Sequence, residues 1–170
     1  MAFHCFFVEL KKNTVDVQNA YDDNCTDYQD TIPHLFYYNA FLMLSNGMEA
    51  KVGTLGSKYE FFHEWKRLAE EDQGNVALET MLRGICKKEN FLDLFENFIL
   101  YDHSNGHTAK ILARNHQYLG VNEAMKAYAA RKLNDGKLGV FWHTQGSGKS
   151  YSMVLFAQKV RRNLQFSVHL

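Results

Sequence analysis

LGVFWHTQGSGKS, at residues 138–150, is the most informative stretch of this 170-residue sequence. Its apolar half, Leu138 to Trp142, predicts a buried strand. A helix is expected directly after it, from about Tyr151 to Arg161. A glycine-rich turn between a strand and a helix is typical of loops that bind phosphate, because exposed N–H groups and the helix amino terminus attract an anion.

Each residue type in this turn has a physical role. Gly146 and Gly148 let the backbone curl and approach a phosphate without a Cβ clash. Lys149 would reach the β- and γ-phosphates of a nucleotide, and the Ser150 hydroxyl would hold Mg²⁺. The remaining loop positions, predicted to bind nucleotide with them, are Thr144, Gln145 and Ser147. His143 stands where such loops usually have their first glycine, and the alternative is a glycine turn without a ligand.

A second motif lies upstream, where Arg114-Asn115-His116-Gln117 precedes a helix predicted over 122–133. A glutamine can pair in a bidentate way with N6 and N7 of adenine. Alone, Gln117 would be read as a surface residue. Since a phosphate loop follows it, we predict that Gln117 contacts the adenine of a bound nucleotide.

The amino-terminal segment offers a possible metal site. Residues 3–10 predict a buried strand, on which Glu9 and Lys11 share one face because side chains alternate. A carboxylate there can hold a divalent metal, and a neighbouring lysine can orient water for phosphodiester attack. The alternative is a solvated strand end. Asn24 and Tyr28, spaced i, i+4 on a helix expected over 15–28, could support the site or contact DNA.

Apolar periodicity and turn residues predict the other elements. A strand over 40–44 ends at the turn Ser45-Asn46-Gly47, and Pro33 marks a helix start or a loop. Residues 58–101 are expected to be largely helical. One apolar stripe in this region consists of Phe61, Phe62, Trp65 and Leu68. Further short strands are predicted at 98–101, 109–112 and 166–168.

Composition excludes several classes of protein. Nineteen basic residues balance nineteen acidic ones, so no net charge indicates nucleic acid or a membrane surface, although a local basic patch could still bind DNA. The three cysteines, Cys5, Cys25 and Cys86, form no zinc motif or disulfide framework. The apolar amino terminus is interrupted at Glu9, too soon for a signal peptide or membrane span. A cytoplasmic protein without membrane contact is expected.

Together these segments resemble the restriction subunit of type I restriction-modification systems. The nuclease part of the resemblance rests on Val8–Lys11, Ala20–Asn24, 32–41 and Leu44–Gly47, and the linker part on Phe62–Arg67 and Leu92–Phe98. The segment 111–117 resembles the adenine motif of that family. Gly139 to Ser150 is similar to its first motor motif and is very specific. The resemblance covers essentially the whole chain.

The resemblance implies an α/β fold with three parts. These are a partial PD-(D/E)xK nuclease sheet (1–57), a helical connector (58–104) and the beginning of a P-loop, helicase-like (RecA-like) motor domain (105–170). Glu9 and Lys11 match the E-x-K of the nuclease, and Gln117 matches the adenine-reading glutamine. Asn24 and Tyr28 have the spacing at which the family often has a glutamine and a tyrosine.

The activity implied by the resemblance is ATP-driven DNA translocation coupled to endonuclease cleavage of unmodified double-stranded DNA. The implied cofactors are ATP and Mg²⁺, with metal contacts at Glu9 and Ser150. The implied partners are the modification and specificity subunits. A metal-binding aspartate before Glu9 and the acidic box for ATP hydrolysis are not in the sequence. The 170-residue chain is therefore expected to be inactive alone, with exposed sheet edges at 3–8, 41–44 and 166–168.

Two alternatives differ in class from this reading. One is a non-catalytic remnant or regulatory fragment that binds only a nucleotide or a partner. The other is an unrelated phosphate-loop kinase, which the architecture disfavours. In small kinases the loop lies near the beginning of the domain, with substrate and lid segments after it.

Overall fold

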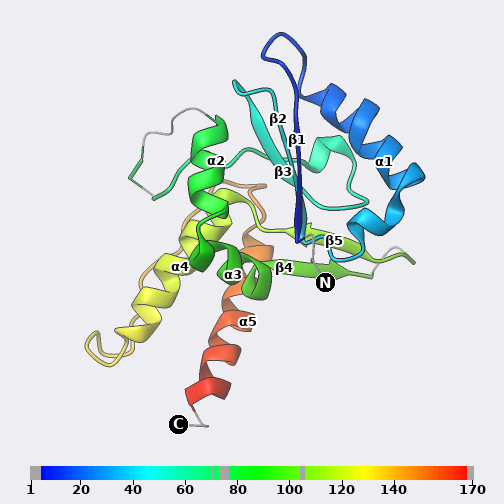
Figure 1. Cartoon of the computed structure of the whole chain (residues 1–170). Helices are drawn as coiled ribbons and strands as arrows, with labels where there is room; N and C mark the ends of the chain where they lie inside the picture. Colours follow the sequence, from blue (N-terminus) through cyan, green and yellow to red (C-terminus); the bar gives the residue numbers. More distant parts are fainter. Residues whose placement is uncertain (1–4, 70, 73–76, 104–105, 168–170) are drawn as a thin grey trace.

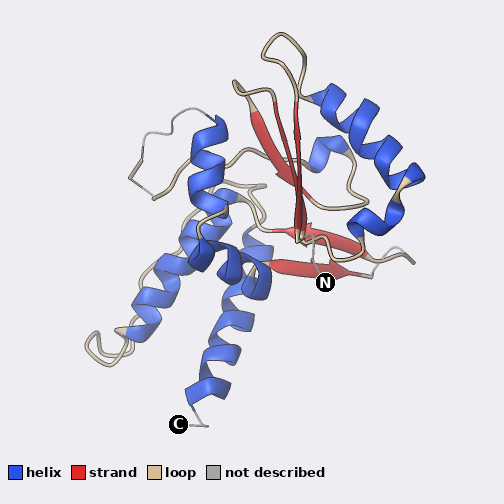
Figure 2. Ribbon diagram, in the orientation of Figure 1, coloured by secondary structure: helices blue, strands red, loops and turns tan. Residues whose placement is uncertain are grey.

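The computed structural model of the chain describes residues 5–69, 71–72, 77–103 and 106–167 (Figure 1). Figure 2 shows two small sheets set among helices, so the predicted mixed α/β class is confirmed. Within the described ranges, no helix is long and apolar enough to cross a bilayer.

The larger sheet has the strand order β1-β2-β3. β1 (Phe6–Leu10) is parallel to β2 (Phe41–Ser45), and β3 (Ala50–Gly53) is antiparallel to β2. The strands predicted near 3–10 and 40–44 are thus confirmed for the described residues. The expected turn follows β2, where Oδ1 of Asn46 accepts hydrogen bonds from the N–H groups of Met48 and Glu49 (3.0 and 2.8 Å).

A helical crossover joins β1 to β2, as parallel strands require. It comprises the π-helix η1 (Ala20–Cys25), α1 (Thr26–Thr31) and the 3₁₀ helix η2 (Pro33–Phe36). Pro33 begins η2, as predicted for a helix start. These segments and one sheet face form a buried cluster of Val17, Ala20, Cys25, Phe36, Leu42, Leu44 and Phe62.

The opposite sheet face packs on the second half of the chain. That half contains α2 (Ala77–Ile85), α3 (Lys88–Asn97) and the antiparallel pair β4 (Ile99–Asp102) and β5 (Ala109–Leu112), which confirms both predicted strands. The shared core includes Phe41, Met43, Val52, Trp65, Met81, Ile85, Leu94, Phe98, Tyr118 and Leu155. Residues that are distant in the sequence therefore form one continuous core.

The helical stripe predicted over residues 61–68 is wrong. Only the short 3₁₀ helix η3 (Tyr59–Phe61) forms, and the chain then runs extended beside β3. Val52 and His63 exchange two backbone hydrogen bonds of 2.9 and 3.0 Å. Phe62 enters the core on one face of the sheet and Trp65 the core on the other. A helix would have placed both rings on one stripe, so tertiary packing overrides the local pattern.

The last two helices are α4 (Asn115–Ala129) and α5 (Lys149–Ser167). α4 begins and ends earlier than the helix predicted over 122–133. The strand predicted at 138–142 is wrong: Val140 and Trp142 are 94% and 77% exposed, and no described strand pairs with this segment. A strand requires a hydrogen-bonded neighbour. The strand predicted at 166–168 is also wrong for 166 and 167, which belong to α5, whereas 168 lies outside the described residues.

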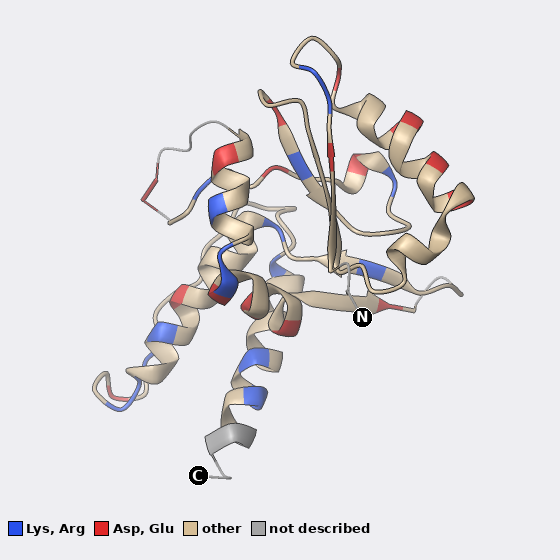
Figure 3. Ribbon diagram, in the orientation of Figure 1, with Lys and Arg blue, Asp and Glu red and all other residues tan. Residues whose placement is uncertain are grey.

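The predicted sheet edges are only partly correct. β2 is the central strand and is buried throughout, so the expectation of an exposed edge at 41–44 is wrong. β1 is an edge strand, with Phe6 39% and Leu10 59% exposed. Charge is unevenly distributed although it sums to zero. η1 and α1 carry only acidic charges and α5 only basic ones (Figure 3).

Candidate functional site

The glycine-rich turn adopts the backbone that its glycines permit. Gly146 and Gly148 have φ angles of +78° and +81°, a region that other residues rarely occupy. α5 begins at Lys149, so its amino terminus faces the turn. The Lys149 ammonium donates hydrogen bonds to the carbonyl oxygens of His143 (2.7 Å) and Thr144 (3.4 Å). An exposed cation and the amino terminus of a helix are thus brought to one place, an arrangement that suits a phosphate.

The structure places Gln117 directly against this loop. Its side chain is 4% exposed, and its Nε2 donates to the carbonyl oxygens of Gly148 (3.1 Å) and Ser147 (3.4 Å). Its Oε1 accepts the N–H of Arg114 at 2.8 Å. The two motifs singled out in the sequence therefore meet in space. Both ends of the carboxamide are engaged, so contact with adenine would have to replace these bonds.

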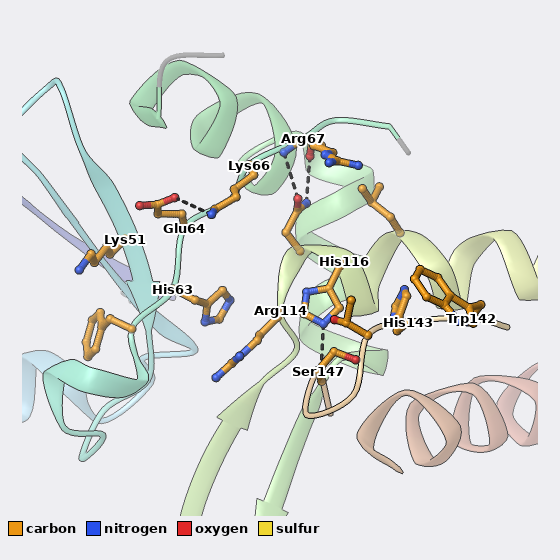
Figure 4. A pocket seen from close by; sticks show the side chains of 14 residues that line it. Lys51, His63, Glu64, Lys66, Arg67, Arg114, His116, Trp142, His143 and Ser147 are labelled. Atoms are coloured by element: carbon orange, nitrogen blue, oxygen red, sulfur yellow. Dashed lines mark hydrogen bonds and ion pairs between the residues drawn. The ribbon is translucent and has the colours of Figure 1, made fainter. Parts of the chain in front are cut away.

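A cationic cleft of about 610 Å³ opens beside the loop (Figure 4). Its walls come from β3, the extended chain after η3, the beginning of α4 and the loop before α5. Its charged and histidine side chains are Lys51, His63, Glu64, Lys66, Arg67, Arg114, His116 and His143. The one carboxylate, Glu64, lies 3.3 Å from Lys66. The cleft is therefore suited to an anion.

The histidines of the cleft differ in their roles. Burial first, and the nearby positive charge of Arg114 in addition, lower the pKa of His63 to about 4, so the ring is neutral at pH 7. The Nε2 of His116 lies 2.9 Å from the carbonyl oxygen of Ser147. Because a carbonyl can only accept, this nitrogen must carry the proton. His116 thus acts as a tether for the loop.

Asn115 fixes the width of the cleft. Its side chain is 6% exposed and forms two hydrogen bonds with the backbone of Arg67. Oδ1 accepts the Arg67 N–H at 3.0 Å, and Nδ2 donates to the Arg67 carbonyl at 2.9 Å. The carboxamide therefore ties the extended segment to α4, as a paired strand would. Sequence reasoning missed these cleft residues, since no local pattern indicates that segment 63–67 faces Arg114.

The predicted nuclease residues lie on or next to β1, η1 and α1. The Lys11 ammonium donates a hydrogen bond to Oδ1 of Asn24, which joins β1 to η1. Burial raises the pKa of Cys25, and the charge of Glu9 raises it further, so Glu9 faces the same helix. Tyr28 instead packs its ring edge-on against Phe7, with the ring centroids 6.0 Å apart.

The predicted metal contacts are not completed by neighbouring side chains. In the described part of the chain, no group of three or more His, Cys, Asp and Glu residues is placed to hold a metal ion. Glu9 is partly buried on β1, and Ser150 lies exposed in the first turn of α5. A divalent ion at either residue would need further ligands from substrate or from other protein segments.

Two family models match the chain. The model of the type I restriction enzyme R protein N terminus matches residues 4–61, which include β1, β2 and β3. The model of the SWI2/SNF2 ATPase matches residues 116–168, which include Gln117 and the phosphate loop. The chain thus combines a segment similar to the R protein N terminus with a segment similar to the SWI2/SNF2 ATPase.

Known relatives agree with the match to the type I restriction enzyme model. The chain is 37% identical over 163 residues to the type I restriction enzyme HindI endonuclease subunit of Haemophilus influenzae, a match that covers 89% of the chain. It is 28% identical over 189 residues to a Methanocaldococcus jannaschii protein assigned provisionally as the type I restriction enzyme MjaIXP endonuclease subunit, with 97% of the chain covered. The chain spans 15% and 18% of the lengths of these relatives. It belongs to the family of type I restriction enzyme R subunits, which confirms the resemblance found in the sequence.

Proposed function

We propose that the chain is the part of an R subunit in which a PD-(D/E)xK nuclease sheet (1–57) meets, through a connector (58–104), the beginning of a helicase-like motor (105–170). The observation that carries this proposal is the contact between Gln117 and the phosphate loop, since a nucleotide site needs an adenine contact and a phosphate contact close together. The whole subunit would translocate DNA with ATP and cleave unmodified double-stranded DNA. It would do so in the cytoplasm with its modification and specificity subunits.

In this proposal the nucleotide lies across the loop. Lys149 leaves the carbonyl oxygens of His143 and Thr144 and pairs with the β- and γ-phosphates, while Ser150 holds Mg²⁺. Gln117 exchanges its bonds to the loop for the adenine edge. The cations of the cleft add positive potential beside the phosphates, which strengthens binding of the multiply charged nucleotide.

In the nuclease part, Glu9 would bind a divalent metal and Lys11 would orient the attacking water. Asn24 supports this arrangement, because it accepts a hydrogen bond from Lys11 and so fixes the direction of the ammonium. Tyr28 has a structural role in packing α1 on β1. Several carboxylates must converge on a catalytic metal ion. Because the described residues offer no such cluster, we propose that the isolated chain turns over neither DNA nor ATP.

Binding of ATP with Mg²⁺, measured by calorimetry on the 170-residue chain and its variants, tests the nucleotide site. Lys149→Ala removes a charge-assisted contact and should weaken binding by about 1.5–3 kcal/mol, roughly 10- to 150-fold. Lys137→Ala, an exposed lysine in the turn after α4, is the matched control and should leave affinity unchanged. Equal affinity for the Lys149 variant and wild type, or no binding at all, would contradict the assignment.

Turnover is tested separately with plasmid DNA, Mg²⁺ and ATP. We expect neither nicking nor phosphate release from the chain alone. Nicking that disappears in Glu9→Ala, or phosphate release that disappears in Lys149→Ala, would show that the chain assembles a complete catalytic centre.

A further inference from the structure

A half-buried ionic network joins the helix of the phosphate loop to α3. The Lys159 ammonium on α5 lies 2.5 and 2.7 Å from the two carboxylate oxygens of Asp93 and 2.6 Å from Oδ1 of Asn122 on α4. The side chains of Lys159 and Asp93 are only 14% and 22% exposed. All three protons of the ammonium therefore have acceptors. Because the ion pair is largely buried, removing one partner would leave the charge of the other uncompensated.

A second contact repeats this connection one turn further along both helices. Arg162 on α5 donates to Oδ1 of Asn97 on α3 at 3.1 Å. Asn97 in turn donates to Asp93 at 2.9 Å. The two contacts are side by side, so they fix the direction of α5 against α3 as well as its distance.

The other end of this helix pair lies at the nucleotide site. Lys149 is the first residue of α5, and Lys159 lies ten residues further along it, about 15 Å at the helical rise. An α-helix of this length is stiff on that scale. A displacement of the phosphate loop would therefore move Lys159 and alter its contact with Asp93.

α3 also touches the nuclease sheet. The Phe91 ring lies 5.8 Å from that of Phe6 on β1 and 5.6 Å from that of Phe41 on β2, measured between centroids. Phe6 and Glu9 point to opposite faces of β1 because side chains alternate along a strand. α3 therefore packs on the face of β1 that is opposite to Glu9.

We propose that α3 relays the state of the phosphate loop to β1, with Asp93 and Lys159 as the positioning residues on the side of α5 and Phe91, two residues before Asp93, on the side of β1. The inference rests on the proposed nucleotide site and adds to it a route by which nucleotide binding regulates the nuclease strand. Such coupling is physical when one element is held by both sites. A second connection exists through α4 and Arg67, but it ends beside β3 rather than on β1.

Amide hydrogen exchange on the 170-residue chain, with and without saturating ATP and Mg²⁺, tests this relay. In wild type, nucleotide should slow exchange in β1 by roughly fivefold or more, the lower end of typical coupling between sites. Lys159→Met keeps the aliphatic stem but loses the charge. In this variant α4 and α5 should still be protected by ATP, while protection of β1 falls below roughly twofold.

Two further variants keep the test decisive if Lys159→Met does not fold. Asp93→Asn is nearly isosteric, and Phe91→Leu acts where α3 contacts β1; each should uncouple β1 in the same way. Glu79→Gln, which removes the exposed ion pair with Arg83 on α2, is the control and should leave coupling intact. A merely structural role would weaken protection of α5 and β1 together.

The failures are distinguishable. If ATP binds and β1 does not respond in wild type, or if β1 still responds in all three variants, the relay is wrong and the nucleotide site stands. If ATP does not bind, the proposed function and the relay both fail.

Discussion

Replacing Asn115 by alanine should separate the extended segment 62–67 from α4. The substitution removes two hydrogen bonds of 3.0 and 2.9 Å to the Arg67 backbone at a site that is 6% exposed. At about 1 kcal/mol for each bond, the free energy of unfolding should fall by about 2 kcal/mol. For a chain of this size that corresponds to a loss of about 4–8 °C in Tm.

Urea unfolding followed by tryptophan fluorescence is a suitable assay, since Trp65 is 1% exposed and reports on this segment directly. Asn90→Ala provides the matched comparison. Asn90 is a partly buried asparagine with one hydrogen bond, 2.9 Å long, to the carbonyl of Gly84. Its replacement by alanine should therefore lower the free energy of unfolding by about 1 kcal/mol. If Asn115→Ala is no more destabilising than Asn90→Ala, the reasoning that Asn115 acts as a double tether is refuted.

Three other outcomes are expected. The pKa of His63 is lowered from 6.5 to about 4 in the folded chain, so its contribution to stability is full above pH 6.5 and is lost as the pH drops from 6.5 towards 4. In urea titrations at several pH values, the free energy of unfolding of His63→Gln should fall on acidification by about 2–4 kcal/mol less than that of wild type. Gly148→Ala should abolish ATP binding in calorimetry, because its Cβ would lie 2.6 Å from Nε2 of Gln117 and its φ is +81°; unchanged affinity would exclude the observed loop geometry. Arg114→Gln should weaken ATP binding severalfold through loss of a cation of the cleft, whereas Arg83→Gln on α2 should not, and equal effects would remove the cleft from the nucleotide site.

The accuracy of the sequence-based prediction depends on where the structural information lies. β2 and the turn after it could be predicted because an apolar run and Ser45-Asn46-Gly47 specify them locally. The segment around Gln117 and the glycine-rich turn were predicted to serve one nucleotide, and Gln117 does lie against the turn, whereas its contact with adenine stays a prediction. Both inferences used residues whose chemical roles can be deduced from the sequence without knowledge of their spatial neighbours.

The wrong secondary-structure predictions concern segments whose conformation depends on neighbouring parts of the chain. Phe62 and Trp65 have helical spacing, but each belongs to a different core, and pairing with β3 makes the chain extended. Residues 138–142 have the apolar character of a strand, but Val140 is 94% exposed because no described strand pairs with them. Local pattern gives the preference of a segment, and hydrogen-bonded partners determine whether it is realised.

The cleft illustrates the same principle at the level of function. Three of its four cations, Lys66, Arg67 and Arg114, lie between residues 61 and 116, in the interval that neither family model covers. One side of the cleft is the segment that packs on the three-stranded sheet through Phe62 and Trp65, and the other side contacts the glycine-rich turn through His116. A ligand in the cleft would therefore touch both parts of the chain at once. The interval between the two matched segments thus contributes residues to the cleft.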